Sequence, residues 1–306
     1  MPSLRARLVE ALLPLLGIKR FFAQPDRMDA RIARLRRKKP VRPRSKWHKH
    51  FDISETVQDG YPLITVNPKG GAVPGGPHIL YLHGGGYVMD IADLHYDAVC
   101  TLCADLGASA SIPLYPLAPE TTVATTLPAM RRLYDRLADQ YGAGALHVMG
   151  DSAGGGMTLA LAQDVAASGG PPPASLVLFS PWLDATGSGE GQAALEARDK
   201  MLALAGLSAC ASRYGGDVPP HDPRLSPLFG KLDDLPPTAI FVGTHDILLV
   251  DGQRLAARIC AADSPHLYRE YDAMPHVWML LPVPEGKQAL TETAAFVTRH
   301  HQGAGT

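Results

Sequence analysis

The fold of this chain can be read outward from one segment, HVMGDSAGGGMTLALA (residues 147–162). An apolar run ends at Gly150, and a helical pattern begins directly after Ser152. Glycines two residues before and two residues after the serine match G-x-S-x-G, a strand-to-helix turn too tight for a Cβ at either glycine. Such a turn lifts the serine hydroxyl above a sheet, at the positive end of a helix. The pattern predicts that Ser152 is a nucleophile; the alternative is a glycine-rich turn with an incidental serine.

A second glycine motif lies upstream. The segment HILYLHGGGYVMD (78–90) ends an apolar run with Gly84, Gly85 and Gly86. Without side chains in the way, their N–H groups can face an incoming carbonyl oxygen, which is what an oxyanion hole requires. The N–H of Ala153, next to the serine, is the other expected donor. A triple glycine alone indicates a flexible turn equally well, but the two motifs together predict acyl transfer.

Acyl transfer by a serine also needs a histidine base and a carboxylate that orients it, in the chain order Ser, Asp/Glu, His. Asp246 follows the apolar run TAIFVG, and His276 follows HLYREYD. Loops past the carboxyl ends of parallel strands gather at one edge of the sheet, so both side chains can meet the serine. Asp246 is the expected acid and His276 the expected base. Asp251 and Asp272 compete for the acid role, whereas His245 is only a neighbour of the acid.

Two residues beside these motifs are candidates for substrate binding. Tyr87 follows the triple glycine and is expected to line the acyl or alcohol pocket, with a structural aromatic as the alternative. Asp151, directly before the nucleophile, is the second candidate.

The order of apolar and helical segments predicts an α/β fold, a mostly parallel sheet flanked by helices. The predicted strands are 50–57, 61–67, 78–84, 108–114, 145–150, 175–180, 238–243 and 266–272, and the main helices are 91–106, 125–141, 153–167, 249–262 and 287–300. The first two strands alternate in polarity around Asp59 and Gly60, which indicates an antiparallel hairpin at one edge. Between Asp184 and Pro236 the alternation lapses into an insertion, with one weak helix over 192–205 and a second continuing through Tyr214.

Composition excludes several classes of protein. With 46% hydrophobic and 19% charged residues, the 306-residue chain is globular rather than disordered. Four cysteines are too sparse for a disulfide framework, and no second CxxC completes a zinc site. We therefore expect no structural disulfides and no metal site.

Charge is distributed unevenly along the chain. Residues 1–50 hold 15 Lys/Arg and 3 Asp/Glu, whereas residues 51–306 hold 14 and 27. The basic segment is expected to be solvated or to dock on the acidic body. It carries no base-reading motif, so nucleic acid is not an expected partner, while contact with an anionic membrane surface is an alternative.

The first 16 residues contain leucines at helical spacing, which predicts an amphipathic helix that Pro14 bends or ends. A second helix is expected near Arg27–Arg37. Glu10 interrupts the apolar run, Lys19 and Arg20 close it, and no small-residue cleavage site follows, so neither a signal peptide nor a spanning helix is expected. The expected location is the cytoplasm.

Taken together, these motifs resemble those of the hormone-sensitive-lipase-like branch of the α/β hydrolases, the bacterial family IV esterases. The resemblance runs from Pro77 to the C-terminus. Its motifs are HGGGY (83–87), YPLAPE (115–120), GDSAGG (150–155), SPWLD (180–184), SPL (226–228), LPP with GTHD (235–246) and His276. Two positions depart from the family pattern. Pro116 stands where the family usually has Arg, which leaves the role of Glu120 open. Val277 follows the expected base, where the family usually has Gly.

The resemblance implies hydrolysis of small or short-acyl carboxylic esters without a cofactor, and frequent homodimers. It implies that two of the three amides of Gly84, Gly85 and Gly86 join Ala153. It also implies that residues 1–46 form a helical cap over a catalytic domain of residues 47–306, with a further contribution from the insertion around 185–220. Related activities are deacetylation and lactone hydrolysis, and some members of the fold are non-catalytic binders that lack the histidine, which is present here.

Overall fold

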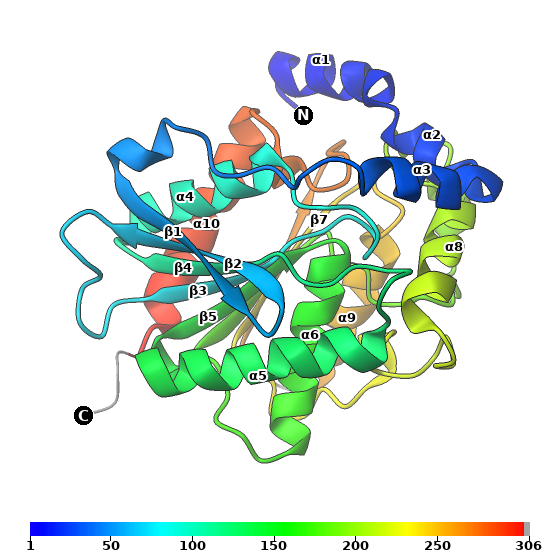
Figure 1. The fold of residues 1–306 in the computed structure, drawn as a ribbon. Coiled ribbons are helices and arrows are strands. Elements are labelled where there is room, and N and C mark those ends of the chain that lie inside the picture. The colour runs from blue at the N-terminus through cyan, green and yellow to red at the C-terminus, as the bar shows by residue number, and fades with distance from the viewer. Residues whose placement is uncertain (263, 303–306) are drawn as a thin grey trace.

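A computed structural model describes residues 1–262 and 264–302. In it the chain forms one eight-stranded sheet with flanking helices (Figure 1). The strands are β1 (Phe51–Gln58), β2 (Tyr61–Pro68), β3 (His78–Leu82), β4 (Ser109–Pro113), β5 (Leu146–Asp151), β6 (Ser175–Phe179), β7 (Thr238–Gly243) and β8 (His266–Tyr271). Each run predicted as a strand forms one, and the order across the sheet is β1-β2-β4-β3-β5-β6-β7-β8. The predicted architecture is confirmed.

Strand direction positions the site. β1 and β2 form the expected antiparallel hairpin, closed by Asp59 and Gly60 with φ values of 47° and 86° that suit a tight two-residue turn. β2 also runs antiparallel to β4, while all other neighbouring strands are parallel. The chain leaves β3 for β4 on one side and later enters β5 on the other. The carboxyl ends of β3 and β5 therefore flank a topological switch point, where α/β folds bind ligands.

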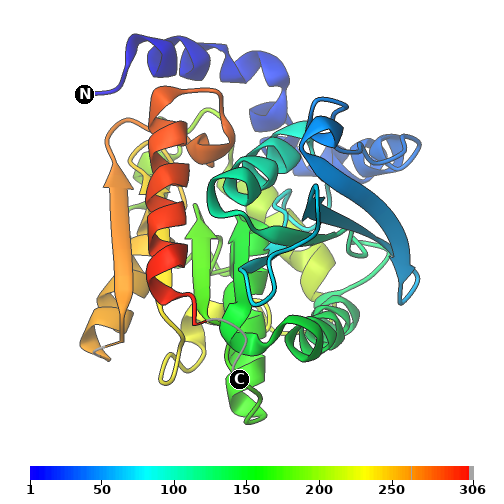
Figure 2. The ribbon, with the colours of Figure 1, turned by 90° about the vertical axis from the view of Figure 1, so that its left-hand side faces the viewer.

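Helices cover both faces of the sheet. The helices are α1 (Leu4–Leu12), α2 (Ile18–Phe22), α3 (Met28–Leu35), α4 (Asp93–Leu106), α5 (Val123–Tyr141), α6 (Ala153–Ala167), α7 (Gln192–Leu195), α8 (Leu204–Gly215), α9 (Leu249–Ala261) and α10 (Pro284–His300). Short 3-10 turns are η1 (Leu13–Leu16), η2 (Pro25–Arg27), η3 (Trp47–Lys49), η4 (Ala143–Ala145), η5 (Pro227–Phe229) and η6 (Trp278–Leu280). α4 and α10 pack on one face, and α5, α6 and α9 lie on the other (Figures 1 and 2). Because both faces are covered, β3 to β7 are buried along their whole length, which explains their continuous apolar sequences.

The N-terminal helices and the insertion pack together. Gly206 of α8 lies so close to the backbone of Phe22 in α2 that a Cβ at position 206 would overlap it. Below this contact, Sγ of Cys210 is 3.7 Å from Sδ of Met28. The two predicted N-terminal helices form as α1 and α3, and α1 ends just before Pro14. The short helix α2 between them was not predicted. Among the helices of the described residues, none has the length and apolar content needed to cross a bilayer.

The predicted helix over 192–205 is wrong. α7 is a single turn that ends at Leu195, and α8 begins only at Leu204. Between them, the Asp199 carboxylate accepts hydrogen bonds from the N–H groups of Met201 and Leu202, both at 2.7 Å. A side chain that bonds its own neighbouring backbone offers those amides an alternative to a helix, so the segment forms a loop.

Candidate active site

Ser152 occupies a strained turn between β5 and α6. Its φ of 51° is rare for residues other than glycine, and its N–H donates to the carbonyl of Phe179 on β6 at 2.9 Å. A Cβ on Gly154 would overlap the carbonyl of Leu82, and a Cβ on Gly150 would lie 2.8 Å from the same oxygen. The two glycines of the motif therefore allow β3 and α6 to approach closely enough to hold the serine in this turn.

A cavity of about 180 Å³ lies at the switch point and is bordered by Ser152 and His276. The N-terminal segment lines one side of the cavity with the apolar residues Leu13, Leu16, Ile18 and Phe22. Among the described residues, no hydrogen bond joins the His276 ring to the Ser152 hydroxyl; its ring bonds Asp246. Catalytic hydrogen bonds often tighten only when substrate is bound. The two side chains thus face one space that an ester can enter.

His276 and Asp246 form a buried pair. They lie in the loops after β8 and β7, where Nδ1 of His276 is 2.8 Å from Oδ2 of Asp246. The exposed fractions are 3% and 0%. Burial acts to lower the pKa of His276, but the charge of Asp246 and its hydrogen bond outweigh burial and raise that pKa. The pairing leaves Nε2 as the free nitrogen of a strengthened base.

A second buried carboxylate, Asp199, accompanies this pair. Its Oδ2 accepts a hydrogen bond from the N–H of Ile247 at 3.0 Å, next to Asp246 in the chain. Burial and the charge of Asp246 raise the pKa of Asp199, and Asp199 in turn contributes to the raised pKa of His276. Sequence reasoning missed this residue because it belongs to no motif; its only signal is an isolated acid in front of the apolar run MLALAGL.

The three glycines of the upstream motif have different partners. The N–H of Gly84 donates to Oδ1 of Asp151 at 2.9 Å, and a Cβ on Gly84 would overlap that carboxylate. Gly85 and Gly86 have φ values of 113° and 61° and border the cavity. Ala153 is the first residue of α6, where a backbone N–H has no partner within the helix. With Gly84 occupied, the amides of Gly85, Gly86 and Ala153 are left for a ligand oxygen.

Asp151 belongs to a buried network. It also accepts a hydrogen bond from the Tyr81 hydroxyl at 2.8 Å, and its Oδ2 is 3.3 Å from Nε2 of His95. Burial acts to raise the pKa of Asp151, but His95, Tyr81 and the Gly84 amide lower it overall. Although Asp151 borders the cavity, its oxygens bond the protein, and its geometry suits positioning of the glycine loop better than substrate binding.

Tyr87 packs away from the cavity. Its ring stacks on Tyr214 of α8 with centroids 3.7 Å apart. The Trp182 ring is tilted against Tyr87, with centroids 5.7 Å apart. Only 2% of Tyr87 is exposed. Of the two sequence readings, the geometry fits the structural aromatic, which joins the glycine loop to the insertion.

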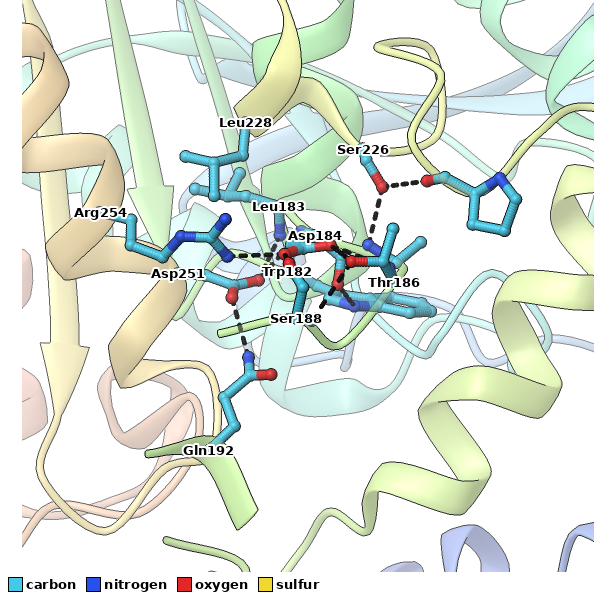
Figure 3. Close-up of polar contacts among 12 residues, drawn as sticks. Trp182, Leu183, Asp184, Thr186, Ser188, Gln192, Ser226, Leu228, Asp251 and Arg254 are labelled. Atoms are coloured by element: carbon cyan, nitrogen blue, oxygen red, sulfur yellow. Dashed lines mark hydrogen bonds and ion pairs between the residues drawn. The ribbon is translucent and has the colours of Figure 1, made fainter. Parts of the chain in front are cut away.

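Asp251, the first competitor for the acid role, serves the insertion instead (Figure 3). Its Oδ2 accepts hydrogen bonds from the N–H groups of Leu183 and Asp184 at 2.8 and 3.0 Å, and its Oδ1 accepts one from Gln192 at 2.8 Å. Burial raises its pKa to about 7. Beside it, Arg254 pairs with Asp184 at 2.6 Å, so this cluster ties α9 to the chain after β6.

The remaining competitors also lie elsewhere. Asp272 is exposed on the loop after β8. His245 turns to α1, where its Nδ1 is 2.6 Å from Oε1 of Glu10. Only Asp246 is brought to the His276 ring by a hydrogen bond.

Both departures from the family pattern have local consequences. Arg36, at the end of α3, supplies the cation that Pro116 lacks. Its Nε is 3.0 Å from Glu120, and its Nη1 donates to the Val88 carbonyl at 2.9 Å. Val277 has a φ of 49°, a strained conformation for a β-branched residue, and its N–H donates to the Ser180 hydroxyl at 3.1 Å.

The remaining candidate chemistries are a metal cluster and the cysteine thiols. Within residues 1–262 and 264–302, no group of three or more His, Cys, Asp or Glu side chains is arranged to hold a metal ion. The four cysteines are free, and burial raises the pKa of Cys100 to about 12, which keeps it protonated.

Comparisons with known proteins define the class. Residues 79–280 match the model of the α/β hydrolase fold family. An acetyl-hydrolase from Streptomyces hygroscopicus is 33% identical, with 72% of this chain and 75% of that protein aligned. A triacylglycerol lipase from Mycobacterium tuberculosis is 30% identical over 75% of this chain, but the chain spans only about half of it (47%).

Solved structures give the same assignment. An esterase from the bacterial hormone-sensitive lipase family superposes with a TM-score of 0.81 at 29% identity, covering 98% of this chain and 99% of that one. An esterase/lipase from an uncultured bacterium gives 0.84 at 28% identity, covering 97% and 99%. The chain belongs to the hormone-sensitive-lipase-like branch of the α/β hydrolase family.

Proposed function

We propose that this chain is a carboxylesterase that hydrolyses small or short-acyl esters through a covalent acyl-enzyme. The observation that carries the proposal is the buried His276–Asp246 pair, whose histidine borders the same small cavity as the strained Ser152. Relatives named acetyl-hydrolase, esterase and lipase support the same reaction class.

In the proposed mechanism, Oγ of Ser152 attacks the ester carbonyl carbon while Nε2 of His276 takes the hydroxyl proton. The carbonyl oxygen becomes an oxyanion that accepts hydrogen bonds from the amides of Gly85, Gly86 and Ala153. The carbon–oxygen bond to the alcohol then breaks, and the imidazolium returns its proton to the leaving oxygen. Water repeats the sequence on the acyl-enzyme and releases the acid. Asp246 holds the tautomer and stabilises the imidazolium charge.

The size of the cavity supports a short acyl group. Its volume of about 180 Å³ is below the roughly 300–1,000 Å³ common for pockets that enclose drug-sized ligands. Residues 1–46 and the insertion around 185–220 act as the cap that encloses it. The similarity to an acetyl-hydrolase favours, as a second candidate, deacetylation of a small molecule by the same residues.

Replacement of the nucleophile tests the proposal. Ser152→Ala should reduce the turnover of p-nitrophenyl acetate by about 10⁴ to 10⁶-fold, because the triad acts as a unit. Ser54→Ala, on the exposed part of β1, is the matched control and should keep the wild-type rate. Wild-type turnover by Ser152→Ala would contradict the proposal. A series from acetate to decanoate, with acetylated amines and lactones beside it, separates the candidate substrates.

A further inference from the structure

The N-terminal helix turns its leucines outward. Ten large apolar side chains of the described residues are markedly exposed, and six of them lie within the first 16 residues. Five of these six form what we call the leucine stripe: Leu4, Leu8, Leu12, Leu15 and Leu16. The first three are four residues apart on α1 and therefore share one face of the helix. Figures 1 and 2 both show α1 along the outer edge of the molecule.

The inner side of α1 is held by polar contacts. Ser3 donates to the Glu285 carboxylate at the start of α10, with 3.0 Å between its Oγ and Oε2. Glu10 contacts His245 as described above. A surface helix ordinarily buries its apolar face and exposes its polar one. On α1, Ala6 is buried and Val9 packs against the core, while Leu4, Leu8 and Leu12 stay exposed. Packing of the chain alone therefore does not account for the leucine stripe.

Unpaired positive charge accompanies the stripe. Residues 1–39 contain eleven Lys/Arg and three Asp/Glu. Of the acids, Glu10 and Asp29 are engaged by His245 and Arg213. In the part of the chain that the structure describes, eight exposed cations of this segment form no ion pair: Arg5, Arg7, Arg20, Arg27, Arg34, Arg37, Lys38 and Lys39. Apolar side chains among free cations are the composition of segments that lie on anionic lipid.

The stripe leads to the active-site cavity. Leu16 is 63% exposed, yet it borders the same cavity as Ser152. Leu13 and Ile18, on either side of it, also line this cavity. An apolar ester that leaves a surface in contact with the stripe would meet leucine side chains up to the site.

We infer that the leucine stripe and the unpaired cations of residues 1–39 dock the protein on an anionic lipid surface. This inference rests on the proposed function, and the substrates are then short-acyl esters of apolar alcohols that are dissolved in the lipid surface. Binding of a nucleic acid would use the cations but would not explain why the leucine side chains are exposed. A second copy of the chain would bring two strongly basic segments together, which like-charge repulsion opposes.

Vesicle sedimentation tests the docking. The wild-type protein should bind vesicles of phosphatidylglycerol and phosphatidylcholine more tightly than vesicles of phosphatidylcholine alone, and 0.5 M salt should weaken this preference. Leu8→Ser/Leu12→Ser/Leu15→Ser should lower the partition coefficient by about tenfold or more, since less apolar surface enters the lipid. Arg5→Gln/Arg7→Gln should weaken binding only to the anionic vesicles.

Matched exposed residues provide the control. Val57 and Val73 are 75% and 63% exposed outside the N-terminal segment, so Val57→Ser/Val73→Ser should bind as the wild type does. Equal partition of the leucine variant and the wild type would overturn the proposal. The proposal would also be overturned if the wild type bound no vesicles and sedimentation equilibrium showed a dimer that the leucine variant does not form. A second copy of the chain would then cover the stripe.

Activity separates this proposal from the proposed function. Ser152→Ala should still bind vesicles like the wild type. The leucine variant should keep its rate on a water-soluble short ester and lose at least about tenfold on an ester presented in anionic vesicles, following its lost partition. An inactive wild type that binds vesicles would defeat the proposed function alone, and an active wild type that ignores them would defeat the docking alone.

Discussion

At the scale of single residues, the site depends on groups that touch one another only in the fold. Ser152, His276 and Asp246 could be predicted because each follows a recognisable strand, and the serine carries its own glycine pattern. Asp199 could not, because its contact with Ile247, next to Asp246, joins two loops that are distant in the sequence. The role of Asp151 was equally hidden, since its partners Tyr81 and His95 come from other elements.

Asp199 is expected to act as a positioning residue through His276. Its negative charge helps raise the pKa of His276, so Asp199→Asn should lower that pKa. Because the base works in its neutral form, the acidic limb of the kcat/KM profile should move to lower pH, by about half to one unit. Asp52→Asn, an exposed carboxylate on β1, is the control. An acidic limb that stays in place would mean that Asp199 only holds the loop.

At the scale of elements, sequence periodicity predicted all eight strands and the main helices, since the buried strands carry continuous apolar runs. It failed in the insertion. There, Asp199 takes two backbone amides that a helix would use, and Asp251 takes two more at Leu183 and Asp184. The Asp251 bonds join segments 67 and 68 residues apart, which no local pattern contains, whereas the Asp199 bonds are local and compete directly with the helix.

The Asp251 cluster makes a prediction about stability. Burial raises the pKa of Asp251 to about 7, against about 3.9 in an unfolded chain, so the folded protein binds the extra proton between these values. The stability that the folded protein gains from this protonated carboxyl is fully present below pH 4 and is lost as the pH rises through 7. Asp251→Asn stays neutral throughout. Relative to the wild type, its free energy of unfolding should therefore rise with pH between 4 and 7, on the order of 1 kcal/mol per unit, and then level off.

Urea unfolding at several pH values measures this difference. Asp272→Asn, on an exposed carboxylate, serves as the control and should run parallel to the wild type. A constant difference between Asp251→Asn and the wild type from pH 4 to 8 would show that Asp251 is already ionised when folded.

At the scale of the whole molecule, the basic N-terminal segment divides into two parts. Arg42 pairs with Glu55, and Arg44 pairs with Asp93 and Asp97, as expected for docking on an acidic body. Arg36 reaches Glu120 beside the glycine loop. Eight cations of residues 1–39 are different, because they remain exposed and unpaired within the described chain. The charge distribution along the sequence indicated that the basic segment docks on the acidic body of the protein. Only the fold shows which of its cations are paired and which are free.

The central claim is that Ser152, activated by His276, attacks an acyl carbon at this cavity. Incubation with diethyl p-nitrophenyl phosphate tests it directly, because the attacking oxygen keeps one diethylphosphoryl group and releases one p-nitrophenol. Peptide mass spectrometry should find that group on Ser152 alone. Labelling should be slowed by about 10³-fold or more in His276→Ala. Stoichiometric labelling at another residue, or wild-type labelling of Ser152 without His276, would contradict the account.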